Sequence, residues 1–320
     1  YVDFDLGKDC ELESIVIKPY IKTQLFSGIW YELFYWDYVI GILLFSLVWG
    51  LTLGSIGEGG RGFMQDLQQV GMENFWSAFL GGVIFNASNI LLSASMSLAG
   101  MSVAFPIGVG LALVLGVFVN YSSVPKGDPV TLFGGVFLIV LAIVFNGIAS
   151  GKVSEVSGQT VRKRGVLIAV CAGILMAFFY RFVAAAIDLE NLESPAVGMM
   201  TPYSALFVFA IGIFISNFLF NSLLMRKPFT GVPVAYSQYF KGNMNTHLVG
   251  IFGGAIWALG TACSYIAAGT AGAAISYGLG QGATMVAALW GVFIWKEFKG
   301  GSKSTNLLIV LMFVPDTRST

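Results

Sequence analysis

The chain is dominated by long runs of apolar residues that are separated by short polar connections. Crossing a bilayer as a helix takes about 20 apolar residues, and eight runs reach that length. A ninth run, at 305–314, is too short to span, because a helix rises only about 1.5 Å per residue. The pattern predicts an all-α membrane protein with eight spans at roughly 36–54, 75–98, 101–121, 130–149, 165–187, 203–225, 247–268 and 271–295.

The composition argues against soluble and catalytic classes of protein. Charged residues make up 11% of the chain, whereas soluble domains carry about 25%. The net charge is zero, so the chain has no overall positive charge that would attract nucleic acid. The three cysteines are scattered, and a zinc site or a catalytic triad would depend on the single histidine, His247. We therefore expect no enzyme activity, no cofactor and no metal.

The loop charges predict how the chain is oriented in the membrane. Cytoplasmic loops are enriched in lysine and arginine. The opposite loops carry Arg61 and Lys126, and one of them is acidic at Asp188, Glu190 and Glu193. We expect the basic side to be cytoplasmic, in a plasma or cell inner membrane. Its basic residues are Lys152, Arg162, Lys163, Arg164, Arg226, Lys227, Lys241, Lys296, Lys299 and Lys303.

Two stretches of the chain resemble each other. "LGGVIFNASNILLSASMSLAG" begins at Leu80, and "FGGAIWALGTACSYIAAGTAG" begins at Phe252. Both open with a glycine pair and close on Ala-Gly, and the helix after each carries Gly-Val-Phe followed by Val or Ile. Agreement in order and spacing across two consecutive helices predicts an internal repeat.

The two copies are separated by five helices, so they lie in opposite orientations in the membrane. Inverted repeats are typical of transporters that bind their substrate near the midplane. We expect two inverted five-helix repeats, with nine of ten helices visible, the first helix missing and the last truncated. The predicted segments are an N-terminal arm outside the membrane at 1–35, a first repeat at 36–149, a basic loop at 150–164, a second repeat at 165–314 and a tail at 315–320.

Four motifs carry a resemblance to a known family. They are "ELFYWDY" at 32–38, "LGGVIFNASNILL" at 80–92, "GMSVAFPIGVGL" at 100–111 and "AGTAGAAISYGLGQGATMVAALWGVFIWKEF" at 268–298. From about Gly28 to Leu311 the chain resembles the drug/metabolite transporter superfamily. Within it, the chain is most similar to ureide permease-like proteins and to glucose/ribose/rhamnose permeases.

The resemblance implies a secondary transporter for a small polar metabolite. The substrate would be a nucleobase or ureide such as allantoin or uracil, or a monosaccharide, with protons as one candidate coupling ion. The alternatives are a polyspecific metabolite or drug exporter and a truncated copy that does not transport. The sequence leaves open the substrate, the direction, the coupling ion and whether the protein is a monomer or a homodimer.

The run "GLGQG" at 278–282 looks like a phosphate-binding loop. Such a fingerprint must follow a strand and open a helix, but here it lies within a membrane-length apolar run. Gly278 and Gly282 are four residues apart and share a helix face. Small residues on one face let neighbouring helices approach closely, so these two glycines predict helix packing.

Polar side chains form stripes on two of the predicted helices, 75–98 and 271–295. An unpaired buried amide costs several kcal/mol, so both stripes should face the interior of the bundle. They would either bind substrate or bond neighbouring helices to each other. The predicted substrate-binding residues are Asn86, Asn89, Ser93, Tyr277, Gln281 and Thr284.

Five further polar residues are candidates for gating or coupling. Asn217 and Asn221 lie one turn apart toward the basic side, where they would form structural bonds or a cytoplasmic gate. Arg181 and Asp188 lie near the other interface, as a charge pair or an outer gate. Asp37 either complements a helix dipole at the start of a span or takes part in proton coupling.

Overall fold

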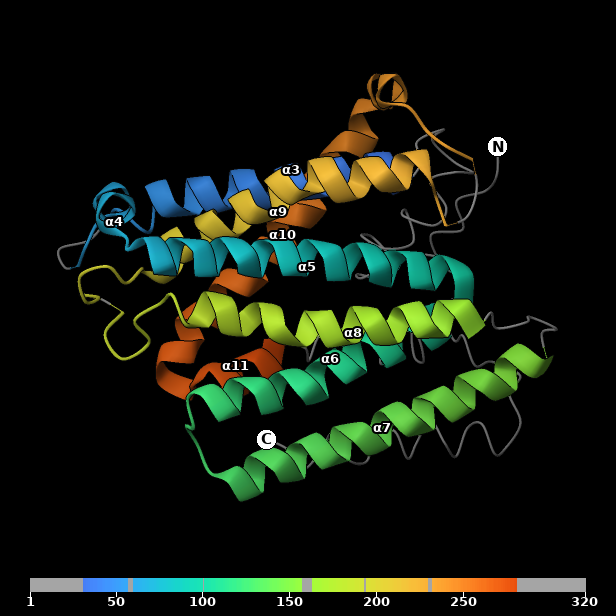
Figure 1. Cartoon of the computed structure of the whole chain (residues 1–320), viewed down its shortest axis with the longest axis horizontal. Coiled ribbons are helices and arrows are strands. Elements are labelled where there is room, and N and C mark those ends of the chain that lie inside the picture. The colour runs from blue at the N-terminus through green and yellow to red at the C-terminus, as the bar shows by residue number, and fades with distance from the viewer. Residues whose placement is uncertain are drawn as a thin grey trace.

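The computed structural model describes residues 31–56, 60–99, 101–156, 163–192, 194–229 and 232–280. Long helices lie side by side along one axis of the molecule (Figure 1). The elements are α3 Tyr31–Leu51, α4 Phe63–Gln69, α5 Met72–Ala99, α6 Met101–Ser123, α7 Pro129–Val156, α8 Lys163–Ala184, α9 Pro202–Arg226, the 3-10 helix η1 Tyr236–Lys241, α10 Met244–Ala271 and α11 Ala273–Gly280.

Six of the described helices are long and apolar enough to cross a membrane. They are α3, α5, α6, α8, α9 and α10, and they confirm an all-α membrane protein. Within the described residues the regular secondary structure is helical except for one isolated bridge between Ile187 and Met200. The predicted span at 271–295 is described only as far as Gly280, and the run at 305–314 lies outside the described residues.

Several boundaries differ from those expected. Helix α3 begins at Tyr31, inside the predicted arm, and α7 continues to Val156, inside the predicted basic loop. The first turns of α3 carry Glu32 and Asp37, whose charges interrupt the apolar pattern although both side chains are almost fully buried. Helix α8 ends at Ala184, before the predicted end at 187.

The core lies where five helices meet. Helix α5 packs against α8 and α9, α3 packs against α10 and α9, and α6 packs against α8. Helix α7 lies at one edge of the molecule and packs on α6 (Figure 1). The centre of the bundle is therefore lined by α3, α5, α8, α9 and α10.

Two helix crossings are built around glycines in the same way. A Cβ added to Gly82 in α5 would lie 2.1 Å from the carbonyl oxygen of Phe209 in α9. A Cβ added to Gly254 in α10 would lie 2.0 Å from the carbonyl oxygen of Tyr38 in α3. Both are the second glycine of the pair that opens each sequence copy. The likeness is what the predicted repeat requires, and the repeat stays a prediction.

Candidate functional site

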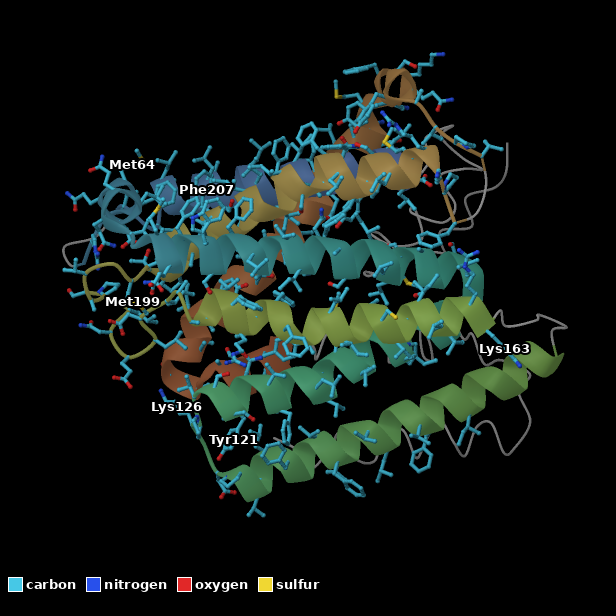
Figure 2. The ribbon with its side chains drawn as sticks, viewed as in Figure 1. Met64, Tyr121, Lys126, Lys163, Met199 and Phe207 are labelled. Atoms are coloured by element: carbon cyan, nitrogen blue, oxygen red, sulfur yellow. The ribbon has the colours of Figure 1, made fainter. Side chains whose placement is uncertain are left out.

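The two ends of the bundle are distinguished by their charged residues. Lys163 lies at the end where α8 begins and where α9 ends at Arg226, and we call this the basic end. Lys126 and Met199 lie at the other end, which we call the opposite end (Figure 2). Polar and aromatic side chains gather at three levels between them: at the centre, toward the basic end and toward the opposite end.

Two aromatic rings are stacked at the centre of the bundle. Phe85 and Trp257 each lie at the middle of a 28-residue helix, α5 and α10. Their ring centroids are 4.4 Å apart, with 28° between the planes. Phe209 of α9 lies 5.6 Å from Phe85, and Tyr38 of α3 lies 6.3 Å from Trp257. Phe179 of α8 lies 5.1 Å from Phe85, so five helices contribute rings to one central stack.

This stack was not predicted from the sequence, although the two matching stretches contain a signal for it. Phe85 and Trp257 are the sixth residues of the two sequence copies. In an inverted repeat, residues at the same position lie symmetrically about one axis, so those closest to the axis meet each other. Within a long apolar run, however, aromatic residues look like ordinary packing.

A polar cluster lies next to the stack, toward the basic end. The Tyr35 hydroxyl donates to Asn86 Oδ1 at 2.8 Å, and Asn86 Nδ2 donates to Ser216 Oγ at 2.9 Å. Asn86 is fully buried and ties α3, α5 and α9 together. Asn89 Nδ2 donates to the Tyr35 hydroxyl at 3.3 Å, and Ser93 bonds to the backbone of its own helix. Of the predicted stripe on α5, Asn89 is therefore the residue most available to a ligand.

Asn217 and Asn221 lie on α9 beyond this cluster. Asn221 Nδ2 donates to the carbonyl oxygen of Glu32 in α3 at 2.7 Å. Asn217 is fully buried, and neither atom of its amide has a hydrogen-bond partner among the described residues. The two residues thus differ. Asn221 bonds α9 to α3, whereas the amide of Asn217 forms no such bond among the described residues.

The predicted stripe at 271–295 is described in part. The Tyr277 hydroxyl donates to the carbonyl oxygens of Ala112 at 3.1 Å and Met176 at 3.3 Å, so it links α11 to α6 and α8. A Cβ added to Gly278 would lie 3.3 Å from the side chain of Val117, which is close packing. The remaining predicted residues, Gln281, Gly282 and Thr284, lie outside the described residues.

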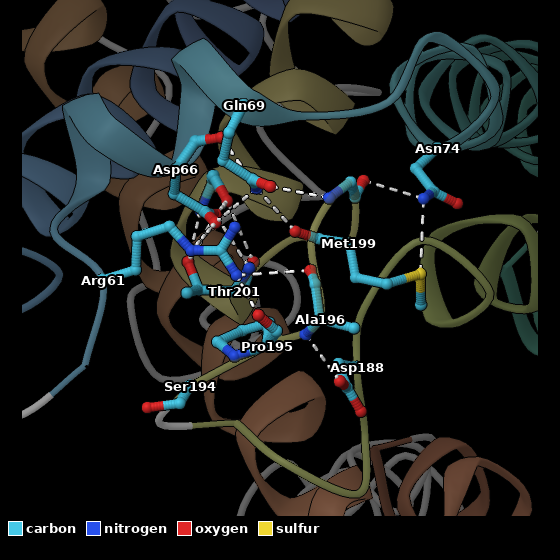
Figure 3. A network of polar contacts seen from close by, with 12 residues as sticks. Arg61, Asp66, Gln69, Asn74, Asp188, Ser194, Pro195, Ala196, Met199 and Thr201 are labelled. Carbon is cyan, nitrogen blue, oxygen red and sulfur yellow. Dashed lines mark hydrogen bonds and ion pairs between the residues drawn. The ribbon is translucent and has the colours of Figure 1, made fainter.

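At the opposite end, a buried carboxylate joins α4 to the start of α9 (Figure 3). Asp66 is fully buried, and Arg61 Nε lies 3.3 Å from Asp66 Oδ1. The backbone N–H of Thr201 donates to Asp66 Oδ2 at 2.8 Å, and the hydroxyls of Thr201 and Ser204 also donate to that oxygen. Gln69 Nε2 donates to Asp66 Oδ1 at 3.1 Å. We call these five residues the opposite-end clasp.

The expected partner of Arg181 is engaged elsewhere. The carboxylate of Asp188 accepts hydrogen bonds from the backbone N–H groups of Ala196 at 2.9 Å and Asn191 at 3.2 Å. It thereby holds the α8–α9 connection in place. Arg181 is exposed at the end of α8, and among the described residues it forms no ion pair with Asp188.

At the basic end, Asp37 joins three elements. His247 Nδ1 of α10 lies 2.8 Å from Asp37 Oδ2, and the Tyr239 hydroxyl of η1 donates to Asp37 Oδ1. Burial and the neighbouring carboxylate raise the pKa of Tyr239, which keeps its hydroxyl protonated as a donor. We call these three residues the basic-end clasp.

The helix-dipole interpretation of Asp37 is not supported. Helix α3 begins at Tyr31, so Asp37 lies almost two turns inside it. The dipole effect falls off within the first turn. The partners of Asp37 are instead the side chains of His247 and Tyr239.

Comparison with known proteins identifies the family of this chain. Residues 149–317, more than half of the 320-residue chain, match the Ureide permease family model. Ureide permease 1 and ureide permease 2 of Arabidopsis thaliana are each 22% identical, over 88% and 87% of this chain and 85% of each relative. Ureide permease 4 of the same plant is 21% identical over 86% of this chain and 84% of its own. The chain therefore belongs to the ureide permease family.

Proposed function

We propose that the chain is a secondary transporter that moves a planar nucleobase or ureide across the membrane by alternating access. Family membership supports a permease rather than an enzyme. The observation that carries the substrate class is the Phe85–Trp257 stack, at the level where transporters with inverted repeats bind their substrates. Flat rings at that level offer a stacking surface to a flat heterocycle.

Asn89 supports the same substrate class. Its side chain lies one turn from Phe85 on α5 and is only partly buried. A primary amide has two donors and an acceptor, which match the carbonyl and N–H groups of nucleobases and ureides. A stacking surface beside an amide is the combination that such a solute requires.

The two clasps support alternating access. The opposite-end clasp joins α4, the element before α5, to α9. The basic-end clasp joins η1, the element before α10, to α3. Because α5 and α10 are the matched helices of the predicted repeat, the clasps occupy corresponding places at opposite ends. A rocking motion of two inverted halves would open them in turn.

The chemistry of the basic-end clasp supports protons as the coupling ion. It contains a buried carboxylate that is bonded to an imidazole and to a phenol hydroxyl, and buried ionisable side chains in membrane bundles often belong to proton relays. In this proposal Asp37 exchanges the proton. His247 and Tyr239 hold the Asp37 carboxylate in place through their hydrogen bonds. The clasp opens when the proton arrives or leaves.

His247→Ala is expected to destabilise the protein by about 2 kcal/mol, because it removes a hydrogen bond to a buried charged group. It is also expected to abolish the dependence of uracil uptake on a pH gradient in proteoliposomes. Thermal unfolding in detergent and uptake at several gradients measure the two effects. Asn245→Ala, an exposed residue in the first turn of the same helix, is the matched control. Gradient-dependent uptake by the His247 variant would refute proton coupling through this clasp.

The substrate class is tested by thermal unfolding of the detergent-purified chain with allantoin, uracil, xanthine, rhamnose, glucose and ribose. A ligand at a hundredfold excess over its Kd stabilises the native state by about 2.7 kcal/mol. We expect a shift with at least one of the first three compounds. We also expect Trp257→Ala to abolish the shift, because it removes one ring of the Phe85–Trp257 pair, while Trp76→Ala, at an exposed tryptophan on α5, retains it.

The other outcomes identify which part of the proposal fails. A shift with sugars alone would assign a monosaccharide, and shifts with every class would assign a polyspecific exporter. A shift that survives in Trp257→Ala would place the binding site elsewhere. A chain with no cooperative transition would favour the copy that does not transport.

A further inference from the structure

Three buried side chains between α3 and α9 carry polar atoms that have no hydrogen-bond partner among the described residues. Trp36 Nε1, both amide atoms of Asn217 and the amide oxygen of Asn221 have no hydrogen-bond partner among the described residues. The adjacent polar residue Ser216 is bonded to Asn86 at 2.9 Å. The Tyr265 hydroxyl of α10 is also buried and unpartnered among the described residues. The unpartnered amide atoms, however, all lie on α9, whereas the buried amides of Asn86 and Asn120 are bonded.

These side chains belong to one interface. Asn217 and Asn221 are one turn apart on the same face of α9. Asn221 is bonded to the backbone of Glu32, and the Trp36 ring lies 4.8 Å from that of Phe218. The face of α9 that carries Asn217 therefore packs on the first turns of α3.

Asn217 also lies between the central stack and the basic end. It follows Phe209, a ring of the central stack, by eight residues along α9, which is about 12 Å of helix. The Tyr35–Asn86–Ser216 bonds lie just before it. A solute that leaves the stack toward the basic end would pass this level.

A fully buried amide with no bonds costs the native state free energy. Leucine, which has nearly the same shape and no polar atoms, would avoid that cost at position 217. Buried polar groups without partners are uncommon in native proteins, and each calls for an explanation. The Asn217 amide therefore has an unused donor, Nδ2, and an unused acceptor, Oδ1, among the described residues. Both lie in the plane of the amide group.

We propose that Asn217 binds the lactam edge of the transported solute, where a ring carbonyl and a ring N–H are adjacent. The amide NH2 donates to the carbonyl, and the amide oxygen accepts from the N–H. On its way to the basic end, the solute thus leaves its stacking contacts at the centre and forms these two hydrogen bonds to Asn217. The inference rests on the proposed function and names the residue that recognises the solute's polar edge.

The test compares uracil and allantoin with 1,3-dimethyluracil, whose ring nitrogens carry methyl groups in place of hydrogen. Isothermal titration of the purified full chain gives Kd for each ligand. Asn217→Leu is expected to weaken binding of uracil or allantoin by about 10- to 100-fold, as expected for two lost hydrogen bonds. The weaker binding of 1,3-dimethyluracil should change by less than about threefold, within the scatter of such measurements.

The ligand-free protein supplies a second readout. The melting temperature of Asn217→Leu should equal or exceed that of the unmodified chain, because the substitution removes unpaired polar groups. Asn217→Ala, which adds no bulk, should weaken uracil binding to the same extent. Asn120→Leu is the matched control, since Asn120 is also buried but bonds to Gly116 of its own helix at 2.8 Å. We expect it to leave every Kd unchanged.

Three outcomes would overturn the inference. If Asn217→Leu and Asn217→Ala bind uracil and allantoin as the unmodified chain does, the inference fails while the proposed function stands. If both variants lose stability and ligand affinity is unchanged, Asn217 is bonded through buried water and has a structural role. If the unmodified chain binds neither these compounds nor xanthine, the proposed function fails and the inference fails with it.

Discussion

Asp66→Ala is expected to destabilise the protein by about 3–5 kcal/mol, the cost of removing one partner from a buried ion pair. The substitution leaves Arg61 without its carboxylate, and Arg61 is itself partly buried. It also removes the acceptor for the backbone N–H of Thr201 at the start of α9 and for two hydroxyls. Chemical or thermal unfolding in detergent measures the loss.

The effect should arise from the clasp and not from the loss of a negative charge. Glu73→Ala is the matched control, because Glu73 is an exposed acid in the first turn of α5, at the same end of the bundle. We expect it to change stability by less than about 0.5 kcal/mol. In a double-mutant cycle, Asp66→Ala and Arg61→Ala should be strongly non-additive, since the residues share one network. Additive losses would show that Arg61 and Asp66 act independently.

The long helices could be predicted because a spanning helix is specified by its own sequence. Each of the six membrane-length helices coincides with an apolar run, and the boundaries differ by a few residues. The short elements α4 and η1 were not predicted, because seven and six residues are too few to show a helical period. These two elements carry Asp66 and Tyr239, so neither clasp was anticipated.

The candidate site could be predicted only in part, because the state of a buried polar group depends on its neighbours. The spacing on α5 correctly placed Asn86 in the interior. It could not tell that Asn86 is fully bonded while Asn217 is not, since the partners of Asn86 are 51 and 130 residues away. Asn217 was expected as a gate or a structural bond. Its amide has no hydrogen-bond partner in the part of the chain that the structure describes, and this depends on how the helices pack.

The charged residues show the same dependence. Arg61 and Asp66 are five residues apart, but the hydroxyl and backbone donors to Asp66 come from residues 135 and 138 positions away. Arg181 and Asp188 looked like a pair because they are close in sequence. Backbone N–H groups of the α8–α9 connection reach Asp188 instead. Proximity along the chain is thus a weak guide to pairing at the ends of a bundle.

Gly254→Ala is expected to destabilise the protein by at least about 3 kcal/mol, at the upper end of the cost of overpacking. The added Cβ would meet the backbone carbonyl of Tyr38 at 2.0 Å, and a backbone atom cannot rotate away as a side chain can. Helices α3 and α10 would have to separate. Gly82→Ala should cost a similar amount, because its Cβ would meet the backbone of Phe209 at 2.1 Å.

Gly260→Ala is the matched control within α10, since a Cβ at Gly260 meets nothing within 4 Å. Alanine is a better helix former than glycine by up to about 1 kcal/mol, so this variant should be neutral or more stable. Thermal unfolding of the three variants therefore separates tight helix contact from helix propensity. Similar losses at positions 82 and 254 would support two crossings of the same construction, as the repeat requires. A large loss at one position alone would mean that the crossings differ and that the repeat does not extend to helix packing.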